Sequence, residues 1–255
     1  MSTFSKPLAN AAIGYEGPLN LPDAITRQGY VLVPRKHLAL NGLEISLAAL
    51  SQSWNCLAPD PMFDAKDGVR LRRYGRIQAD MSNRVLAVLS HQLFNQSKTL
   101  NTKYGGYDRS FAPMEPELLE NVFFRQLIWF NLAYLPLSEA ERQVPWEVGV
   151  HQIRMVTSRQ QPANATPEGP HQDGFRYVTQ HLIAMHHLTG GESRLYLDKT
   201  LPPVVVAPFE SPMDSRLLDD TRVFHDAAGV QVLPGFEQGI RDMLILTFQP
   251  LPTAP

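Results

Sequence analysis

The chain has 255 residues, 44% of them hydrophobic and 19% charged, and its 6 Lys and 17 Arg against 25 acidic residues form no basic stripe of the kind that nucleic acid binding needs. Its single cysteine, Cys56, cannot form an internal disulfide, its first thirty residues lack a signal-peptide pattern, and no apolar run approaches the ~20 residues that span a bilayer. We therefore expect a cytoplasmic protein of one domain, residues 1–255, without nucleic acid or membrane partners.

The chain begins with a segment rich in Pro and Gly. Residues 1–22 predict an irregular arm. Asp23 is expected to cap a short helix that ends at Gly29, and the β-branched and aromatic residues 30–33 predict a short strand. A helix followed by a strand is thus expected after the arm.

Two longer helices are expected in residues 1–145, which we predict to be the helix-rich part. Leu and Trp recur at helical spacing from Asn41 to Leu57, and Asn41 is placed to cap that helix. Pro116 at a first helical position predicts a second helix through Tyr134. The polar segment 92–106 between them is loop-like and is expected to cover a site as a lid.

Residues 69–77 alternate in part and predict a strand with four Arg in seven positions. The plain interpretation is a row of solvated Arg on an exposed face. The alternative is that one Arg, for which Arg73 is the candidate, points inward and pairs with a substrate carboxylate.

After Pro145 short strand-like runs separated by turn residues take over. Evenly spaced short strands over about a hundred residues predict a jelly roll or related barrel in residues 146–250. The fold class is therefore α+β and mainly β, with N-terminal helices beside the barrel. The expected strands are 148–156, 175–183, 193–197, 204–206, 215–218, 222–224, 230–233 and 243–248.

A candidate metal site lies near position 170. His171 and Asp173 are two residues apart, so on an extended strand both would point to one metal ion, and Gly174 would end that strand. His225 is the candidate third ligand from elsewhere in the fold. Two His and one carboxylate form the face that holds non-haem Fe(II) with open positions.

Several further motifs carry a family resemblance. In their order along the chain they resemble those of the bacterial Fe(II)/2-oxoglutarate dioxygenases that hydroxylate free L-amino acids, with L-isoleucine dioxygenase as the best-known type. The motifs are Arg72-Arg73-Tyr74, Asn95-Gln96-Ser97, Gly105-Gly106-x-x-Arg109, Pro167-Glu168-Gly169, His171-x-Asp173-Gly174, Gly190-Gly191-Glu192-Ser193, Asp219-Asp220-x-Arg222-Val223-x-His225 and Gly239-x-Arg241-Asp242 with residues 243–248.

The resemblance implies a double-stranded β-helix (cupin-like) core, Fe(II), 2-oxoglutarate and O2. It implies His171, Asp173 and His225 as metal ligands, with no catalytic residue beyond them. It also implies Arg241 as the partner of the distal carboxylate of 2-oxoglutarate, and a planar guanidinium on a rigid strand suits that role. The implied reaction hydroxylates a C–H bond of a small free L-amino acid, with an aliphatic or thioether side chain, and releases succinate and CO2.

Other assignments are less constrained. Gln152 and Arg154 share one face of strand 148–156, and if that face looks into the barrel Arg154 holds a substrate or cosubstrate carboxylate. Three alternatives stay open: the same chemistry on a modified amino acid or other small acid, a non-redox cupin-type enzyme with Zn or Mn, and a jelly-roll binding module. A homo-oligomer is compatible with all of them.

Overall fold

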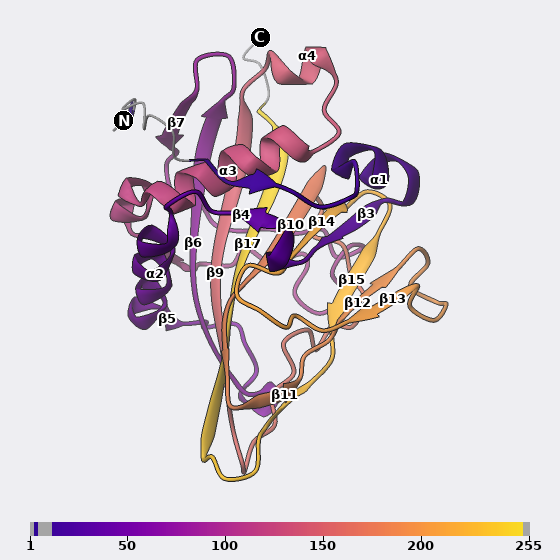
Figure 1. Ribbon diagram of the computed structural model, residues 1–255. Helices are drawn as coiled ribbons and strands as arrows, with labels where there is room; N and C mark the ends of the chain where they lie inside the picture. Colours follow the sequence, from indigo (N-terminus) through magenta and orange to yellow (C-terminus); the bar gives the residue numbers. More distant parts are fainter. Residues whose placement is uncertain (1–2, 5–11, 252–255) are drawn as a thin grey trace.

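The computed structural model describes residues 3–4 and 12–251, and the expected arm therefore lies partly outside the described residues. A large sheet runs through the molecule in the order β1-β7-β6-β9-β17-β10-β14-β3, with β5 and β8 paired to β6 (Figure 1). Its strands are β1 Thr3–Phe4, β3 Tyr30–Val33, β5 Ala58–Pro59, β6 Val69–Asp80, β7 Val85–Val88, β8 Ala112–Pro113, β9 Trp146–Ser158, β10 Tyr177–His186, β14 Ser215–Asp219 and β17 Gln238–Pro250.

Three long antiparallel strands form the centre of this sheet. β9 pairs with β17 along its whole length, from Trp146 opposite Pro250 to Ser158 opposite Gln238. On its other edge β9 pairs with β6 from Trp146 to Val156. Because β6 comes from the helix-rich part of the chain, that part contributes strands to the same sheet as the C-terminal part.

Four α-helices lie in the described residues, all before β9. They are α1 Leu21–Gln28, α2 Glu44–Gln52, α3 Val122–Tyr134 and α4 Glu139–Arg142. Short 3-10 helices are η1 Arg35–His37, η2 Ser53–Cys56, η3 Ala65–Asp67 and η4 Pro116–Glu120. None of these helices combines the length and the apolar character that crossing a membrane requires.

The helix starts differ from those predicted. Asn20, rather than Asp23, caps α1 by accepting the Asp23 backbone N–H, while Gly29 ends the helix with φ 86° as expected. Asn41 has φ 48° and does not cap α2. The helix expected from Pro116 is broken, because Asn121 leaves the helical conformation, ends η4 and caps α3 with its side chain.

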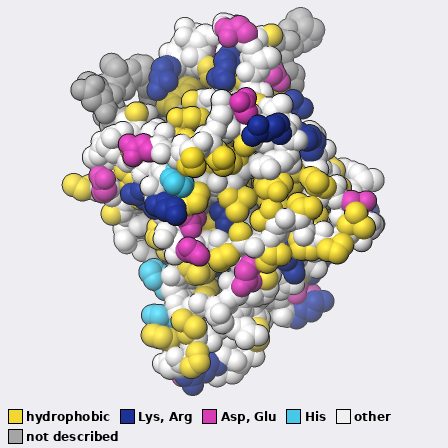
Figure 2. All heavy atoms as spheres, turned by 45° about the vertical axis from the view of Figure 1, so that its right-hand side comes forward, with side chains coloured by type: hydrophobic (Ala, Val, Ile, Leu, Met, Phe, Trp, Pro, Cys, Tyr) yellow, Lys and Arg dark blue, Asp and Glu magenta, His cyan; other side chains and the backbone are white. Residues whose placement is uncertain are grey.

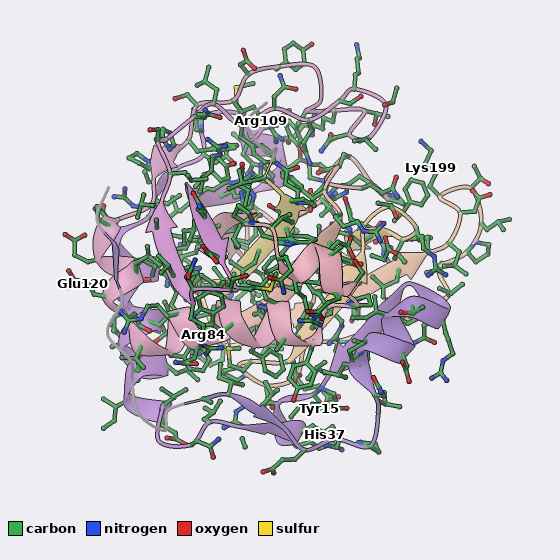
Figure 3. All side chains as sticks on the ribbon, turned by 90° about the horizontal axis from the view of Figure 1, so that it is seen from above. Tyr15, His37, Arg84, Arg109, Glu120 and Lys199 are labelled. Carbon is green, nitrogen blue, oxygen red and sulfur yellow. The ribbon has the colours of Figure 1, made fainter. Side chains whose placement is uncertain are left out.

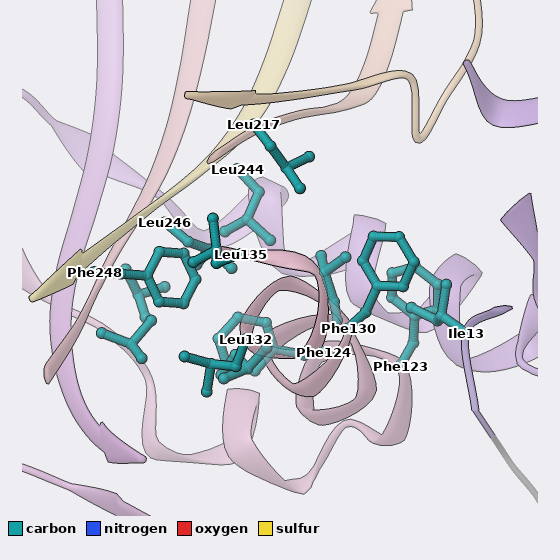
Figure 4. Close-up of a cluster of buried hydrophobic side chains, with 14 of the residues drawn as sticks. Ile13, Phe123, Phe124, Phe130, Leu132, Leu135, Leu217, Leu244, Leu246 and Phe248 are labelled. Carbon is teal, nitrogen blue, oxygen red and sulfur yellow. The ribbon is translucent and has the colours of Figure 1, made fainter. Parts of the chain in front are cut away.

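α3 covers one face of the large sheet. Its Phe123, Phe124 and Phe130 are buried, and they lie in one apolar cluster with Leu244, Leu246 and Phe248 of β17 (Figure 4). Residues two apart on a strand point to the same face, so these even-numbered positions of β17 define the helix-covered face. The odd-numbered positions of β17 point to the opposite, inner face.

Smaller sheets lie opposite the inner face. β12 Ser193–Tyr196 pairs with β13 Val205–Ala207 and β15 Phe224–Ala227, and β11 Leu188–Gly190 pairs with β16 Val230–Val232. Leu195 of β12 packs against Val178 and Leu218 of the large sheet. Two facing sheets of antiparallel strands confirm the predicted mainly β jelly roll with flanking N-terminal helices. A further two-stranded sheet joins β2 Gly14–Tyr15 to β4 Leu38–Ala39.

Most expected strands exist, within a few residues of their predicted bounds. The run 222–224 is shifted to β15, and β17 begins at Gln238, before its predicted start at 243. The strands that were not predicted are β1, β2, β4, β5, β7, β8 and β11. On the outside, β12 and β13 carry exposed apolar side chains in and beside their hairpin, and Figure 2 shows hydrophobic side chains gathered on this side of the molecule. They are Leu197, Leu201, Val204 and Val206.

Candidate metal centre and active site

A pocket lies on the inner face of the large sheet. Alternate residues of the long strands line it, and residues of the facing small sheet and of two loops complete it. The strand contributions are Arg70 and Arg72 from β6, His151, Ile153 and Met155 from β9, Gln180 from β10, and Arg241, Met243 and Ile245 from β17. The pocket and the helix-covered core thus use opposite faces of the same strands.

Three potential metal ligands meet at one wall of this pocket. One ligand atom from each of His171, Asp173 and His225 lies within 4.8 Å of the others. His171 Nε2 is 3.8 Å from Asp173 Oδ1, and His225 Nε2 is 3.5 Å from Asp173 Oδ2. The sequence motif and the distant histidine are therefore brought together in space.

The backbone holds the two histidines side by side. His171 N–H donates to His225 C=O at 3.1 Å, and His225 N–H donates to His171 C=O at 2.9 Å. Residues 171–173 were predicted to lie in a strand. Apart from this bridge, they lie instead in the loop between β9 and β10. Gly174 ends the motif with φ 90°, a conformation that residues with a Cβ rarely adopt.

The buried carboxylate of Asp220 holds the backbone of residues 173–175 in place. Asp220 accepts backbone N–H groups of Asp173 at 3.1 Å, Gly174 at 2.7 Å and Phe175 at 3.1 Å. Asp220 Oδ1 also faces His225 Nδ1 at 3.8 Å. Asp220 therefore both orients the loop and lies beside Nδ1 of His225, the ring nitrogen other than the one next to Asp173.

The loop 92–106 contacts the site as well. Gln96 donates to Asp173 Oδ1 at 2.9 Å and accepts a hydrogen bond from the Arg109 guanidinium. This contact agrees with the expectation that the loop lies over a site. Figure 3 shows Arg109 on the opposite side of the molecule from Tyr15 and His37, which lie beyond α3.

The donor set fits a divalent metal ion. His171 Nδ1 lies 3.0 Å from Gly169 C=O, so a proton on Nδ1 leaves the Nε2 lone pair turned toward Asp173. Burial alone raises the pKa of Asp173, but the neighbouring His225 and His171 lower it below its ordinary value overall. An ionised carboxylate between two imidazoles is the donor set of a two-histidine, one-carboxylate iron site.

Arg241 lies in the same pocket without a counter-charge. The residue is 5% exposed, its Nε has no hydrogen-bond partner, and no carboxylate in the described part of the chain pairs with it. Burial, and next the positive charge of Arg216, lowers the pKa of Arg241 to about 10. A buried guanidinium without a partner is costly, so this end of the pocket suits an anionic ligand.

The other three candidate binding residues do not line the pocket. Arg154 makes two 2.7 Å hydrogen bonds to Asp242, and Gln152 donates to Ser53 at 2.8 Å. Arg73 pairs with Glu115 at 2.6 Å. They point away because the inner face of β6 carries the even positions and that of β9 the odd ones, the reverse of the faces chosen from the sequence.

Several ionisable residues of the pocket were not predicted from the sequence as binding candidates. They are Arg72, Arg109, His151 and Glu168, three of which lie in motifs that carry the family resemblance. The strand register supplies the missing information, because Arg72 lies opposite Ile153 and beside the pocket, whereas Arg73 lies opposite Gln152. No spacing rule within a single strand distinguishes these two faces.

Comparisons with known proteins agree with the site. The sequence model of the 2OG-Fe dioxygenase family matches residues 51–247. The chain is 22% identical over 186 residues to L-isoleucine-4-hydroxylase of Bacillus thuringiensis, and the match covers 72% of this chain and 77% of that relative. It is 23% identical over 238 residues to 3(1)-hydroxy-L-isoleucine 4-dioxygenase of Pantoea ananatis, covering 88% and 93% of the two chains.

A solved structure has the same fold. The crystal structure of IDO from Bacillus thuringiensis superposes with a TM-score of 0.72 at 17% identity, and the match covers 90% of this chain and 97% of that one. At this identity the likeness concerns the arrangement of the strands and helices. It agrees with the jelly roll described above.

Proposed function

Because this chain belongs to the 2OG-Fe dioxygenase family and is a 2-oxoglutarate-dependent iron dioxygenase, we propose that it hydroxylates a C–H bond of a small free L-amino acid. The other products are succinate and CO2. The observation that carries the proposal is the convergence of His171, Asp173 and His225 on the wall of a pocket that also holds the unpaired Arg241. Two relatives named for isoleucine substrates support the choice of an amino acid.

His171, Asp173 and His225 would hold Fe(II). Bound Fe(II) would supply the activation of O2. Three side chains on one face of the metal ion leave other positions open for O2. The chain's own contribution is to fix the three ligands, through the backbone bridge between the two histidines and through Asp220 under the loop. No side chain is needed as a general acid or base.

Arg241 would bind the distal carboxylate of 2-oxoglutarate. Its guanidinium lies on β17, a strand paired on both edges, so its position is rigid. The hydroxyl of Ser193, another buried donor without a partner, lies in the same pocket. Two parallel hydrogen bonds from a guanidinium fix which end of a dicarboxylate faces the metal.

Apolar side chains give the pocket room for an aliphatic or thioether group. Ile153, Met155, Met243 and Ile245 lie on neighbouring strands of the inner face. They exclude water and press a hydrocarbon side chain toward the metal position. We also propose that residues 1–255 work as one domain, because β6 and β9 pair along eleven residues across the division at residue 145.

The test is succinate release from 2-oxoglutarate in air with Fe(II) and ascorbate, measured with each of the twenty L-amino acids. We expect one or a few aliphatic or thioether amino acids to stimulate release, and a His171→Ala variant to lose it. Turnover that is lost in the variant but that no amino acid stimulates would redirect the search to modified amino acids or other small acids. Fe(II) binding without any turnover would favour a non-redox metalloenzyme.

A further inference from the structure

Besides Arg241, a second set of charged residues lines the pocket. Arg72, Arg109 and Glu168 line it, and none of them is a candidate metal ligand. The three come from β6, from the segment after the loop 92–106, and from the loop before His171. Two cations and one anion at one end of a small-molecule pocket suggest recognition of a ligand with both charges.

Arg72 is buried without a counter-charge. It is 6% exposed, its Nε has no partner, and its NH2 group lies 2.7 Å from His151 Nδ1. Burial, and next the charge of Arg70, lowers the pKa of Arg72 to about 9. The neighbouring Arg70 differs, because it forms a 2.7 Å ion pair with Asp60.

Arg109 is also buried without a counter-charge. It is 3% exposed, its Nε has no partner, and its one side-chain hydrogen bond goes to the neutral amide of Gln96. The rings of Phe94 and Phe111 pack against Arg72 and Arg109 and keep water away from both. Since unpaired buried guanidinium groups are costly, an anionic group is expected between them.

Glu168 offers the opposite charge. Its side chain is 7% exposed, and Oε1 accepts a hydrogen bond from Asn101 at 3.3 Å and lies 3.7 Å from His171 Nε2, so this carboxylate is beside the candidate metal centre. Oε2 is buried and has no partner. The other carboxylate of the pocket that is not a candidate ligand, Asp226, is already paired with Arg194 at 2.7 Å, so Glu168 is the acceptor left for a cationic donor.

We infer that this end of the pocket recognises a zwitterionic head group. Arg72 and Arg109 bind the α-carboxylate and Glu168 binds the α-ammonium group, which leaves the side chain directed to the apolar strand residues and the metal. The enzyme therefore requires a free α-amino acid and rejects N-acylated or deaminated acids, which leave the Glu168 carboxylate buried and unpaired. This inference rests on the proposed function and narrows its substrate class.

Calorimetric titration under nitrogen tests the head-group requirement on protein loaded with Fe(II) and 2-oxoglutarate. The probes are L-isoleucine, L-leucine and L-methionine, each compared with its N-acetyl derivative and with the acid that lacks the amino group. We expect the best amino acid to bind about 10- to 100-fold more tightly than both of its analogues, the range for one hydrogen bond to a charged group. Equal or tighter binding of the deaminated acids, or binding of none of the compounds, would overturn the inference.

Substitution of Glu168 tests the assignment of the ammonium site. Glu168→Gln keeps the size and removes the charge, so we expect the preference for the amino acid to shrink about tenfold while the deaminated acid binds as before or more tightly. Glu120→Gln makes the same change on an exposed residue far from the pocket and leaves the preference intact. An unchanged preference in Glu168→Gln would overturn the role of Glu168. If that variant does not fold, Glu168→Asp is expected to retain the preference and Glu168→Met to lose it.

Arg72→Gln is expected to weaken the amino acid and the deaminated acid alike, because both carry the carboxylate, whereas Arg84→Gln on the exposed surface weakens neither. Loss of affinity for the amino acid alone would contradict the carboxylate role. Succinate release in the same preparations distinguishes a failure of this inference from a failure of the proposed function. Protein that turns over 2-oxoglutarate but ignores the head group keeps the dioxygenase and loses this inference, whereas protein without any turnover loses the proposed function.

Discussion

The side-chain amide of Gln96 donates one hydrogen bond to Asp173 Oδ1 at 2.9 Å and another to the Asp173 backbone carbonyl at 3.1 Å. A residue of the loop 92–106 thereby fixes the orientation of the candidate carboxylate ligand. Because Gln96 also accepts from Arg109, the head-group end of the pocket and the metal end are joined through one amide.

Gln96→Ala is expected to lower the affinity for Fe(II) about 10- to 100-fold, the usual effect of removing a group that orients a metal ligand. Anaerobic titration of the metal-free protein with Fe(II) measures it. Gln92→Ala, an exposed residue of the same loop, serves as control and should bind Fe(II) as the wild type does. Equal affinities in the two variants would show that the amide does not position Asp173.

Asp220→Asn is expected to lower the free energy of unfolding by about 2 kcal/mol, because an amide NH2 replaces one of the two oxygens that accept three backbone N–H groups and leaves at least one buried donor unpaired. Urea unfolding at pH 7 measures the change. Asp198→Asn removes an exposed carboxylate that also accepts a loop amide, at 2.8 Å, and should change stability far less. Similar losses in both variants would contradict a special role for the buried cradle.

Arg241→Gln is expected to raise the KM for 2-oxoglutarate about 10- to 100-fold, since it removes hydrogen bonds from a charged donor to a carboxylate. Succinate release at increasing 2-oxoglutarate concentration gives the value. The exposed Arg84→Gln should leave this KM unchanged. An unaltered KM in Arg241→Gln would point to another residue as the anchor of the cosubstrate.

His181 is expected to make the fold sensitive to acid. The ring is fully buried among neutral partners, Asn131, Thr179 and Ser215, and burial lowers its pKa to about 3. Between the ordinary pKa of 6.5 and 3 the unfolded chain binds a proton that the folded chain does not. Stability from this group is therefore complete above pH 6.5 and falls as the pH drops, by at most about 1.4 kcal/mol per pH unit.

Urea unfolding of the wild type and of His181→Gln between pH 7 and pH 4.5 tests this. The variant is expected to be less stable at pH 7, because it loses the hydrogen bonds of the ring, and to lose less stability on acidification. Parallel losses in the two proteins would mean that other groups, chiefly carboxylates, cause the acid sensitivity.

Much of the architecture follows from local patterns. The strand runs after Pro145 and the helical spacing of residues 41–57 were sufficient for the fold class. Caps were harder to predict, since Asn41 and Asp23 fit a capping pattern equally well as the residues that do cap. Asn121 breaks the helix expected from Pro116 because its side chain caps the second half and also donates a hydrogen bond to the Ser46 carbonyl, a long-range contact.

The candidate centre could be predicted in its members but not in its geometry. His171, Asp173 and His225 converge, but a loop held by Asp220 and a backbone bridge, rather than one strand, bring them together. The binding residues show the limit more clearly. Choosing between Arg72 and Arg73 needs the register of β6 against β9, a long-range property that a single sequence does not state.

Alternate residues of β9 and β17 face the core and the pocket, and this alternation has a practical consequence for engineering the enzyme. Along β9 and β17, the side chains that stabilise the helix-covered core and those that shape the pocket never share a position. Mutant libraries limited to Ile153, Met155, Met243 and Ile245 therefore alter the volume around a substrate while the Phe-rich layer under α3 keeps its packing. Selectivity can therefore be altered in this scaffold without changing the core under α3, while Met155 and Met243 stabilise smaller apolar clusters of their own and their replacement costs part of that packing.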